Sequence, residues 1–267
     1  MTPDATSRTH RVGALAVAWL AVSCINTGSR SAPNPRETPW PSTASGTTVE
    51  GTPATSEDEG WKFAASTYVW LARKRGVVDA GGLGIPLDDP DESAGAFLYA
   101  EGEHDRWGFI VDLSLMSTED RSSTNTGEIV VDEDTIAAEL DLTYEPIEDS
   151  SLRFLVGLRL LDSTADLRFP LLPNGHTEVT QLDPVIGAQG TWPLGDEFAF
   201  RLRGDIGGFG LASKSTYQML GLFAWEFADD WRLTTGYRVL GWDFDDGHGT
   251  RSDIRLSGAL LGVALGF

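Results

Sequence analysis

The sequence predicts an all-β protein, an antiparallel up-and-down β-barrel of about ten strands, and three observations support this fold class. Ten segments alternate apolar with polar side chains or form apolar runs of strand length. The connections between these segments alternate between long and short. The last segment continues as a regular strand to Phe267. An even strand count is expected for single-chain barrels, so about eight or twelve strands are the alternatives.

Each predicted strand is at or above the roughly 9 to 11 residues with which a tilted strand crosses a membrane. The ten segments are Trp61 to Arg73, Ala94 to Glu103, Arg106 to Ser117, Thr135 to Pro146, Ser151 to Thr164, Leu182 to Trp192, Glu197 to Gly210, Ser215 to Phe227, Trp231 to Phe244, and Asp253 to Phe267.

The connections differ systematically between odd and even strands. The long, polar connections are Lys74 to Ser93, Thr118 to Asp134, Ala165 to Gln181 and Asp245 to Ser252, with Leu211 to Lys214 as the one short member of this set. The tight connections are His104-Asp105, Ile147 to Ser150, Pro193 to Asp196 and Ala228 to Asp230. Barrels of the bacterial outer membrane have short periplasmic turns and longer outer loops. We therefore expect both barrel termini in the periplasm.

The position of the apolar face distinguishes a membrane barrel from a soluble carrier barrel, which turns apolar side chains inward. In three strands one face is apolar and the other is polar or charged. The apolar faces are Trp107, Phe109, Val111, Leu113 and Leu115; Ile136, Ala138, Leu140, Leu142 and Tyr144; and Phe198, Phe200, Leu202 and Ile206. The opposite faces are Asp112 and Ser114; Glu139, Asp141, Thr143 and Glu145; and Arg201, Arg203 and Asp205. Because ionic side chains are too costly in a dry apolar pocket, we predict a polar lumen and an apolar face turned to lipid.

The charged residues of this lumen are expected to pair with one another. Arg201, Arg203 and Arg238 lie on the less apolar phase of their strands. Their expected partners are Asp112, Glu139, Asp141, Asp183, Asp205 and Glu226. A small barrel has little room once side chains fill it. The sequence therefore predicts a lumen that is largely plugged by ion pairs.

Aromatic residues near the strand ends are expected to form two girdles at the membrane interfaces. The candidates are Trp61, Trp70, Trp107, Tyr144, Trp192, Trp225, Phe227, Trp231 and Trp242.

The final strand has a bulky apolar face and a mostly small face. Phe267, Leu265, Val263, Leu261 and Ala259 form the first face, and Gly266, Ala264, Gly262, Leu260 and Gly258 form the second. A chain that ends in mid-strand on an aromatic residue resembles the C-terminal signature of bacterial outer-membrane β-barrel proteins. The resemblance implies an outer-membrane location, contact with outer-membrane lipid, and recognition by the barrel-assembly machinery through the strand ending in Phe267.

Further motifs resemble a group of small, largely uncharacterised bacterial outer-membrane barrels. They are the run Arg201 to Gly210, Leu182-Asp183-Pro184, Gly236-Tyr237-Arg238 and the closing segment Gly258 to Phe267. The resemblance covers Gly60 to Phe267. It implies a fold and a location and supplies no catalytic residues.

The segment before Gly60 is expected to lie outside the barrel. In residues 1–23, basic residues precede the apolar run Val12 to Val22, which is typical of a signal peptide and short for a membrane-spanning helix. Cleavage after Ser23 fits ordinary signal peptidase, and lipid attachment at Cys24 fits as well, so both alternatives stay open. Residues 24–59 are rich in Ser, Thr and Pro without apolar periodicity, which predicts a disordered tether.

Composition excludes several classes of function. The chain has 40 acidic and 20 basic residues, a formal net charge of -20, which argues against a nucleic-acid partner. Cys24 is the single cysteine, so the chain has no intrachain disulfide and no multi-cysteine metal site.

Few residue groups could support chemistry. His248 beside Asp243, Asp245 and Asp246 is the best candidate for an acid-base cluster, although a polar loop tip is the more ordinary interpretation. Two acidic runs, Asp88 to Glu92 and Asp243 to Asp246, offer oxygen ligands without the spacing of a calcium loop. Arg203-Gly204-Asp205 spells an adhesion tripeptide, but it lies within a strand with both charges toward the lumen. We therefore predict no catalytic residue, no cofactor site and no metal site.

These observations favour a non-enzymatic outer-membrane barrel with a structural or loop-mediated role in the envelope. A narrow porin-like channel for small solutes is one alternative. A surface-exposed enzyme that uses acidic and histidine residues of the rim is another. The sequence sets no oligomeric state, and a monomer is expected.

Overall fold

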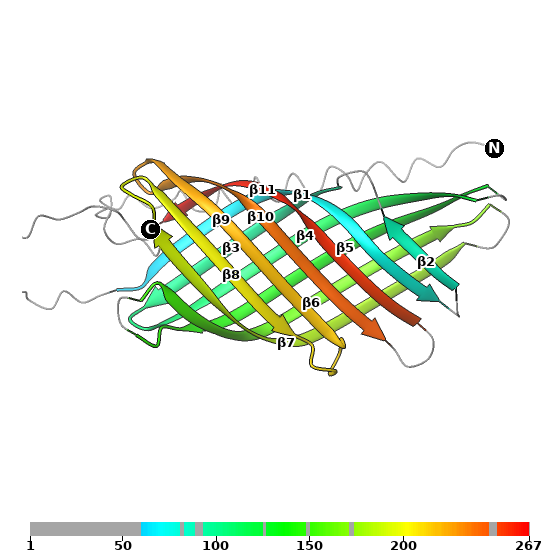
Figure 1. Ribbon diagram of the computed structural model, residues 1–267, viewed down its shortest axis with the longest axis horizontal. Coiled ribbons are helices and arrows are strands. Elements are labelled where there is room, and N and C mark those ends of the chain that lie inside the picture. Colours follow the sequence, from blue (N-terminus) through cyan, green and yellow to red (C-terminus); the bar gives the residue numbers. More distant parts are fainter. Residues whose placement is uncertain are drawn as a thin grey trace, which may run out of the picture.

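The computed structural model describes residues 60–80, 83–88, 93–124, 127–147, 150–170, 174–245 and 250–266. These residues form a closed barrel of antiparallel strands (Figure 1). The barrel proper has ten strands, because one of the eleven strands, β2, pairs only with β1. The sequence prediction of an all-β up-and-down barrel is therefore confirmed. The predicted signal peptide, the predicted tether and Phe267 lie outside the described residues.

Each barrel strand pairs with its neighbour in chain order, and β1 pairs with β11 to close the sheet. The strands are β1 (Lys62–Ala80), β2 (Leu83–Asp88), β3 (Ser93–His104), β4 (Trp107–Thr124), β5 (Gly127–Tyr144), β6 (Leu152–Arg168), β7 (Gly175–Pro193), β8 (Phe198–Gly207), β9 (Ser215–Ala228), β10 (Trp231–Asp245) and β11 (Thr250–Gly266). The described part of the chain contains no apolar helix of membrane-spanning length.

Tight turns gather at one end of the barrel, where β1 begins and β11 ends (Figure 1). Asp105 and Asp230 turn the chain with φ of 51° and 66°. Aspartate tolerates this left-handed region better than most residues. The four connections that were predicted to be tight thus all lie at this end of the barrel, which we call the turn end.

At the opposite end, several predicted loops are paired strands. β4 continues to Thr124 and β5 starts at Gly127, so most of the predicted loop Thr118 to Asp134 is a hairpin. The same correction applies to Lys74 to Ser93, which contains β2, and to Ala165 to Gln181. Polar and apolar side chains are mixed on both faces of these extensions, since Glu128 and Val130 share one face of β5 and Ile129 and Glu133 share the other, so the sequence lacks the regular alternation by which strands are recognised.

The barrel wall is uneven in height. β8 has 10 residues, whereas β4 and β5 have 18 each. In Figure 1 the green hairpins of β4–β5 and β6–β7 reach far beyond the connection between β8 and β9. The barrel therefore has one low side and one high side at the end opposite the turns.

Aromatic residues form a girdle around the outside of the turn end. Ring contacts link Trp107 with Tyr144 at 4.6 Å between centroids, and Phe200 with Phe223 at 4.8 Å. Two residues assigned to the girdles, Trp70 and Trp242, instead face the lumen and are 0% and 6% exposed. Both rings lie on the inward face of their strands. Trp70 on β1 contacts the guanidinium of Arg238, and Trp242 on β10 belongs to the buried apolar cluster of the lumen. The other assigned residues face outward at the turn end: Trp61, Trp107, Tyr144, Trp192, Trp225, Phe227 and Trp231.

Closure of the barrel depends on a glycine at the β1–β11 seam. Gly258 lies opposite Ala72 and faces the lumen, where an added Cβ would meet the backbone oxygen of Leu71. We expect Gly258→Leu to lower the free energy of unfolding by about 1 to 3 kcal/mol through overpacking. Urea unfolding of the refolded barrel, followed by tryptophan fluorescence, measures this change. Ala259→Leu is the matched control, because Ala259 is exposed on the outer face, and equal effects of the two substitutions would contradict the seam argument.

Candidate functional site

The lumen is the part of the barrel where charged residues meet. Strand alternation turns every second side chain inward, and on β4, β5 and β8 this phase is ionic or polar. The buried charged residues of the described lumen are Lys74, Glu101, Glu103, Asp112, Glu133, Glu139, Asp141, Glu145, Arg159, Asp183, Arg201, Arg203, Asp205, Arg232 and Arg238. Their mutual contacts define the site, which we call the lumen network.

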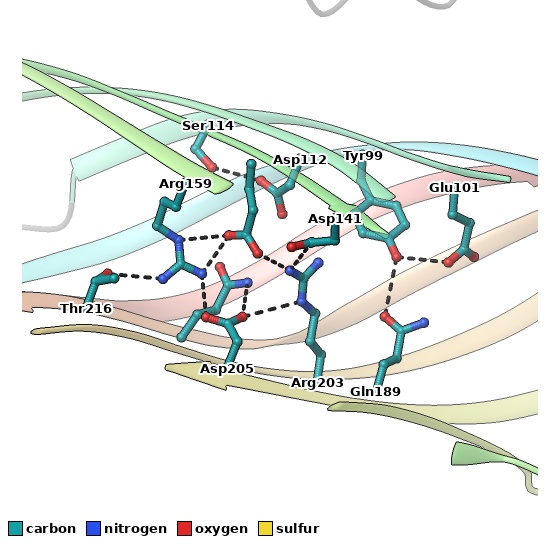
Figure 2. Close-up of polar contacts among 12 residues, drawn as sticks. Tyr99, Glu101, Asp112, Ser114, Asp141, Arg159, Gln189, Arg203, Asp205 and Thr216 are labelled. Carbon is teal, nitrogen blue, oxygen red and sulfur yellow. Dashed lines mark hydrogen bonds and ion pairs between the residues drawn. The ribbon is translucent and has the colours of Figure 1, made fainter. Parts of the chain in front are cut away.

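The centre of the lumen network joins two arginines to three carboxylates (Figure 2). Arg203 on β8 donates to Asp141 Oδ2 at 2.7 Å and also to Glu139. Arg159 on β6 donates to Glu139 Oε2 at 2.6 Å and to Asp205 Oδ1 at 2.5 Å. Figure 2 shows the two guanidinium groups on either side of the Asp205 carboxylate. The centre therefore brings three carboxyl groups and two guanidinium groups into mutual contact.

A second group lies nearer the turn end. Arg201 on β8 makes a bidentate ion pair with Glu101 on β3, with N–O distances of 2.9 and 3.0 Å. The Tyr99 hydroxyl donates to Glu101 at 2.9 Å, and the Gln189 side chain lies 3.4 Å from the same hydroxyl. Bidentate arginine–carboxylate pairs are among the strongest side-chain hydrogen bonds. This group ties β8 to β3 across the lumen.

A third group surrounds Arg238 on β10. Its guanidinium donates to Asp112 at 3.3 Å and lies over the rings of Phe97 and Trp70, 4.5 and 5.7 Å from their centroids. Ser114 Oγ accepts a further hydrogen bond at 3.3 Å. Two aromatic faces and one carboxylate thus hold this cation inside the barrel.

Further ion pairs lie toward both ends of the lumen. Lys74 contacts Glu133 at the end opposite the turns. Arg232 pairs with Glu226 at 2.8 Å near the turn end. Arg153 pairs with Glu103 and Glu145 at the same end. Asp183 instead accepts hydrogen bonds from the backbone and the hydroxyl of Ser213, which anchors the β8–β9 connection to β7.

The lumen also has an apolar side that the sequence analysis did not predict. β9, β10 and β11 turn aliphatic side chains inward, together with aromatic rings from β1 and β3. This cluster includes Tyr68, Trp70, Phe97, Leu220, Leu222, Leu240, Trp242, Ile254, Leu256 and Leu260. The expected polar lumen is therefore polar mainly on the side formed by β4 to β8.

Most of the residues expected in the lumen are found there. Arg201, Arg203 and Arg238 all point inward, and Asp112, Glu139, Asp141 and Asp205 each contact at least one predicted or additional arginine. Two of the predicted carboxylates have other partners, since Glu226 pairs with Arg232 and Asp183 with Ser213. Arg203 and Asp205 of the adhesion-like tripeptide are buried in the network.

Three important members were missed in the sequence. Glu101 lies on a strand whose inward phase also carries Phe97 and Tyr99, so this phase resembles an outer face. Arg159 shares its phase with the buried Leu155 and Leu161. Lys74 lies in a segment that was expected to be a loop. Of these three residues, only Arg159 could have been identified from the sequence, because it lies opposite Glu139 when β5 and β6 are paired as neighbouring strands.

The rim residues considered for catalysis are occupied by ion pairs where they are described. Asp243 pairs with Lys214 at 3.2 Å and Asp245 with Arg251 at 2.8 Å. His248 and Asp246 lie outside the described residues, as does most of the acidic run Asp88 to Glu92. Within the described ranges, no group of three or more His, Cys, Asp or Glu side chains could hold a metal ion.

No protein-family model and no curated protein matches the sequence. The fold is similar to solved bacterial outer-membrane barrels. The outer membrane protease OmpT from Escherichia coli has a TM-score of 0.55 at 9% identity, covering 81% of this chain and 99% of OmpT. Ail, the attachment invasion locus protein of Yersinia pestis, has a TM-score of 0.40 at 14% identity, covering 77% of this chain and 99% of Ail. The outer membrane protein OprG from Pseudomonas aeruginosa has a TM-score of 0.35 at 10% identity, covering 78% of this chain and 95% of OprG. The chain therefore has the fold of the small bacterial outer-membrane β-barrels, as its strand pattern indicated.

The lumen network predicts a large effect of removing its central cation. Arg203 is 0% exposed, and Arg203→Ala would leave Asp141 without the arginine that contacts it. We expect a loss of about 3 to 5 kcal/mol in the free energy of unfolding, because one partner of a buried ion pair is removed. Urea unfolding in micelles measures this loss. Arg168→Ala is the control, since the Arg168–Asp132 pair is exposed at a hairpin tip; a similar loss in both variants would refute a central role for Arg203.

Proposed function

We propose that this chain is a non-enzymatic outer-membrane β-barrel with a structural or loop-mediated role in the envelope and a lumen closed by ion pairs. The observation that carries this proposal is the lumen network, in which β8 is linked to β3, β5 and β6 by buried arginine–carboxylate pairs. Such pairs occupy the path that a solute would take.

The outer surface supports a membrane location. Large apolar side chains are exposed all round the barrel wall, among them Leu140, Leu158, Met219 and Leu261. A soluble monomer rarely exposes contiguous apolar patches of more than a few hundred Å². The aromatic girdle at the turn end is typical of a lipid–water interface. An apolar wall with a girdle is therefore best explained by insertion in a lipid bilayer.

The orientation follows from the unequal ends. We infer that the turn end, with the start of β1 and the end of β11, faces the periplasm and that the hairpins face outward. Recognition by the barrel-assembly machinery through the strand ending in Phe267 is part of this proposal. Monomeric behaviour is also proposed, because every barrel strand finds its neighbour within the chain.

Closure is favoured over conduction because the lumen side chains contact one another rather than line a channel. Arg203, Asp141 and Arg201 are almost inaccessible to solvent. An enzyme role is less well supported, since the described rim carboxylates Asp243 and Asp245 already bind cations of the same chain.

Planar-bilayer recordings test closure directly. We expect the wild-type barrel to show little steady conductance, because the ion pairs fill the lumen. Glu101→Ala combined with Arg201→Ala removes both members of one cross-lumen pair without leaving an unpaired charge, and this variant should conduct more than the wild type. Large and stable currents from the wild type would contradict a closed lumen and would favour the alternative function, a narrow channel.

Cysteine labelling of intact cells tests location and orientation together. Leu211 in the β8–β9 connection is 76% exposed, and Asp229 in a turn at the other end is also exposed. We expect Leu211→Cys to react with a membrane-impermeant maleimide in intact cells, and Asp229→Cys only after the outer membrane is permeabilised. The parent protein, whose sole cysteine is Cys24, gives the background. The reverse labelling pattern would mean that the barrel has the opposite orientation in the membrane. Recovery of the chain as a soluble protein would contradict the membrane location.

A further inference from the structure

The centre of the lumen network holds more carboxyl groups than guanidinium groups. In the two groups beside it, each carboxylate has an arginine of its own, since Glu101 pairs with Arg201 and Asp112 with Arg238. The centre instead combines the carboxyl groups of Glu139, Asp141 and Asp205 with the guanidinium groups of Arg159 and Arg203. All five side chains are buried. If every carboxyl group were ionised, one buried negative charge would have no cation to balance it, which is costly.

The three carboxyl groups differ in the hydrogen-bond donors that reach them. Glu139 accepts from Arg159 Nε at 2.8 Å, from Arg159 Nη2 at 2.6 Å and from Arg203. Asp205 accepts from Arg159 at 2.5 Å and from Gln218 at 3.2 Å. Asp141 accepts a single hydrogen bond, from Arg203 Nη2 at 2.7 Å. Because hydrogen bonds to a carboxylate stabilise its charged form, Asp141 is the least stabilised anion of the three.

The second oxygen of Asp141 lies in surroundings without a donor. Asp141 is 1% exposed, and its Oδ1 has no hydrogen-bond partner among the residues that the structure describes. The residues directly opposite it are Ile110 on β4 and Gly157 on β6. A Cβ added to Gly157 would meet Asp141 Oδ1. The glycine therefore leaves room for the carboxyl group, and neither neighbour has a side chain that could donate to it.

Glu139 and Asp141 also compete for the same donor. Arg203 Nη2 donates to both carboxyl groups, which brings their oxygens close together. Where two carboxyl groups share one site, one of them commonly keeps its proton, because two adjacent negative charges repel each other. A metal ion could also balance the charge, but the described residues contain no group of three or more His, Cys, Asp or Glu side chains that could hold one.

We propose that Asp141 binds one proton at neutral pH, next to the ionised Glu139, and that loss of this proton at alkaline pH loosens the plug. The inference deepens the proposed closed lumen, because an ionised Asp141 would add a charge that attracts water and cations. The charged and titratable side chains of the network around Asp141 are Glu139 on β5, Arg159 on β6, Arg203, Asp205 and Arg201 on β8, Asp112 on β4, Arg238 on β10, and Glu101 and Tyr99 on β3.

Urea unfolding of the refolded full-length chain in micelles, over a series of pH values, tests the proton. Folding should take up one proton, because an aspartate in the unfolded chain is ionised at neutral pH. This site should therefore raise the unfolding equilibrium constant about tenfold per pH unit, up to the pH at which Asp141 ionises in the folded barrel. Asp141→Asn has the shape of the neutral acid and no proton to lose. The variant should match the wild type at mildly acidic pH and lack this tenfold dependence.

Two further variants serve as controls. Asp134→Asn makes the same substitution at an exposed position of β5, and it should keep the pH dependence of the wild type. Glu139→Gln removes a carboxylate that three donors reach, and it should unfold at lower urea than Asp141→Asn. Equal pH dependence of the wild type and Asp141→Asn would overturn the inference, as would equal destabilisation by Asp141→Asn and Glu139→Gln at neutral pH. Sodium chloride that stabilises the wild type but not Asp141→Asn at constant pH would show a metal cation in place of the proton.

Planar-bilayer recordings test the effect on the plug. The wild type should conduct little at neutral pH and conduct more cations at alkaline pH, whereas Asp141→Asn should stay closed at both. A wild type that remains closed at alkaline pH would refute the loosening. Large wild-type currents at every pH would contradict the proposed closed lumen but not the bound proton, which the urea series measures independently.

Discussion

The burial of the Arg203 charge is the constraint on which the rest of the lumen depends. Removing a guanidinium group from water is costly unless carboxylates and hydrogen bonds surround it. Glu139 and Asp141 come from β5, and Asp205 comes from β8 itself. Backbone pairing joins a strand only to its two neighbours, whereas the ion pairs of Arg203 with Glu139 and Asp141 join β8 to β5, which is not its neighbour. The network thus adds a specific internal geometry to a wall that backbone hydrogen bonds alone would leave free to change its cross-section.

The two sides of the lumen complement each other. Arg238 starts from β10, on the apolar side, and reaches Asp112 on β4, with Phe97 beside its guanidinium. Its aliphatic stem can contact the leucines of β9 to β11 while its charged end enters the polar side. The apolar side chains therefore fill space that would otherwise hold water around the ion pairs. The polar side supplies the partners of the buried charges. This division explains how so small a barrel can hold many charges and still exclude solvent from Arg203.

The inward and outward faces of a strand could be predicted from the sequence where the apolar residues face lipid and the polar residues face the lumen. On β5, Leu140 and Leu142 lie on the outer face and Glu139 and Asp141 face the lumen. The sequence therefore predicted correctly which face of β5 points inward. On β3 the inward Phe97 and Tyr99 are larger and more apolar than the outward alanines, and the alternation pointed the wrong way. Glu101 was missed for this reason. Trp70 on β1 was placed in a girdle because it lies near the end of the predicted strand Trp61 to Arg73. The hairpin extensions mix polar and apolar side chains on both faces, as Glu128 and Val130 do on one face of β5, so they lack a regular alternation and their pairing is visible only in the structure.

The distribution of charge matters more for this barrel than its net value. Electrostatic interactions in water are screened over about 8 Å at physiological ionic strength. A group at the membrane boundary therefore responds to the nearest side chains and not to the formal net charge of -20. Asp134 and Asp162 at that boundary accept hydrogen bonds from hydroxyl groups of the opposite strand, whereas at the seam Arg75 lies between Arg255 on β11 and Asp88 on β2. The charge at this boundary therefore differs from one pair of strands to the next, although the chain as a whole is acidic.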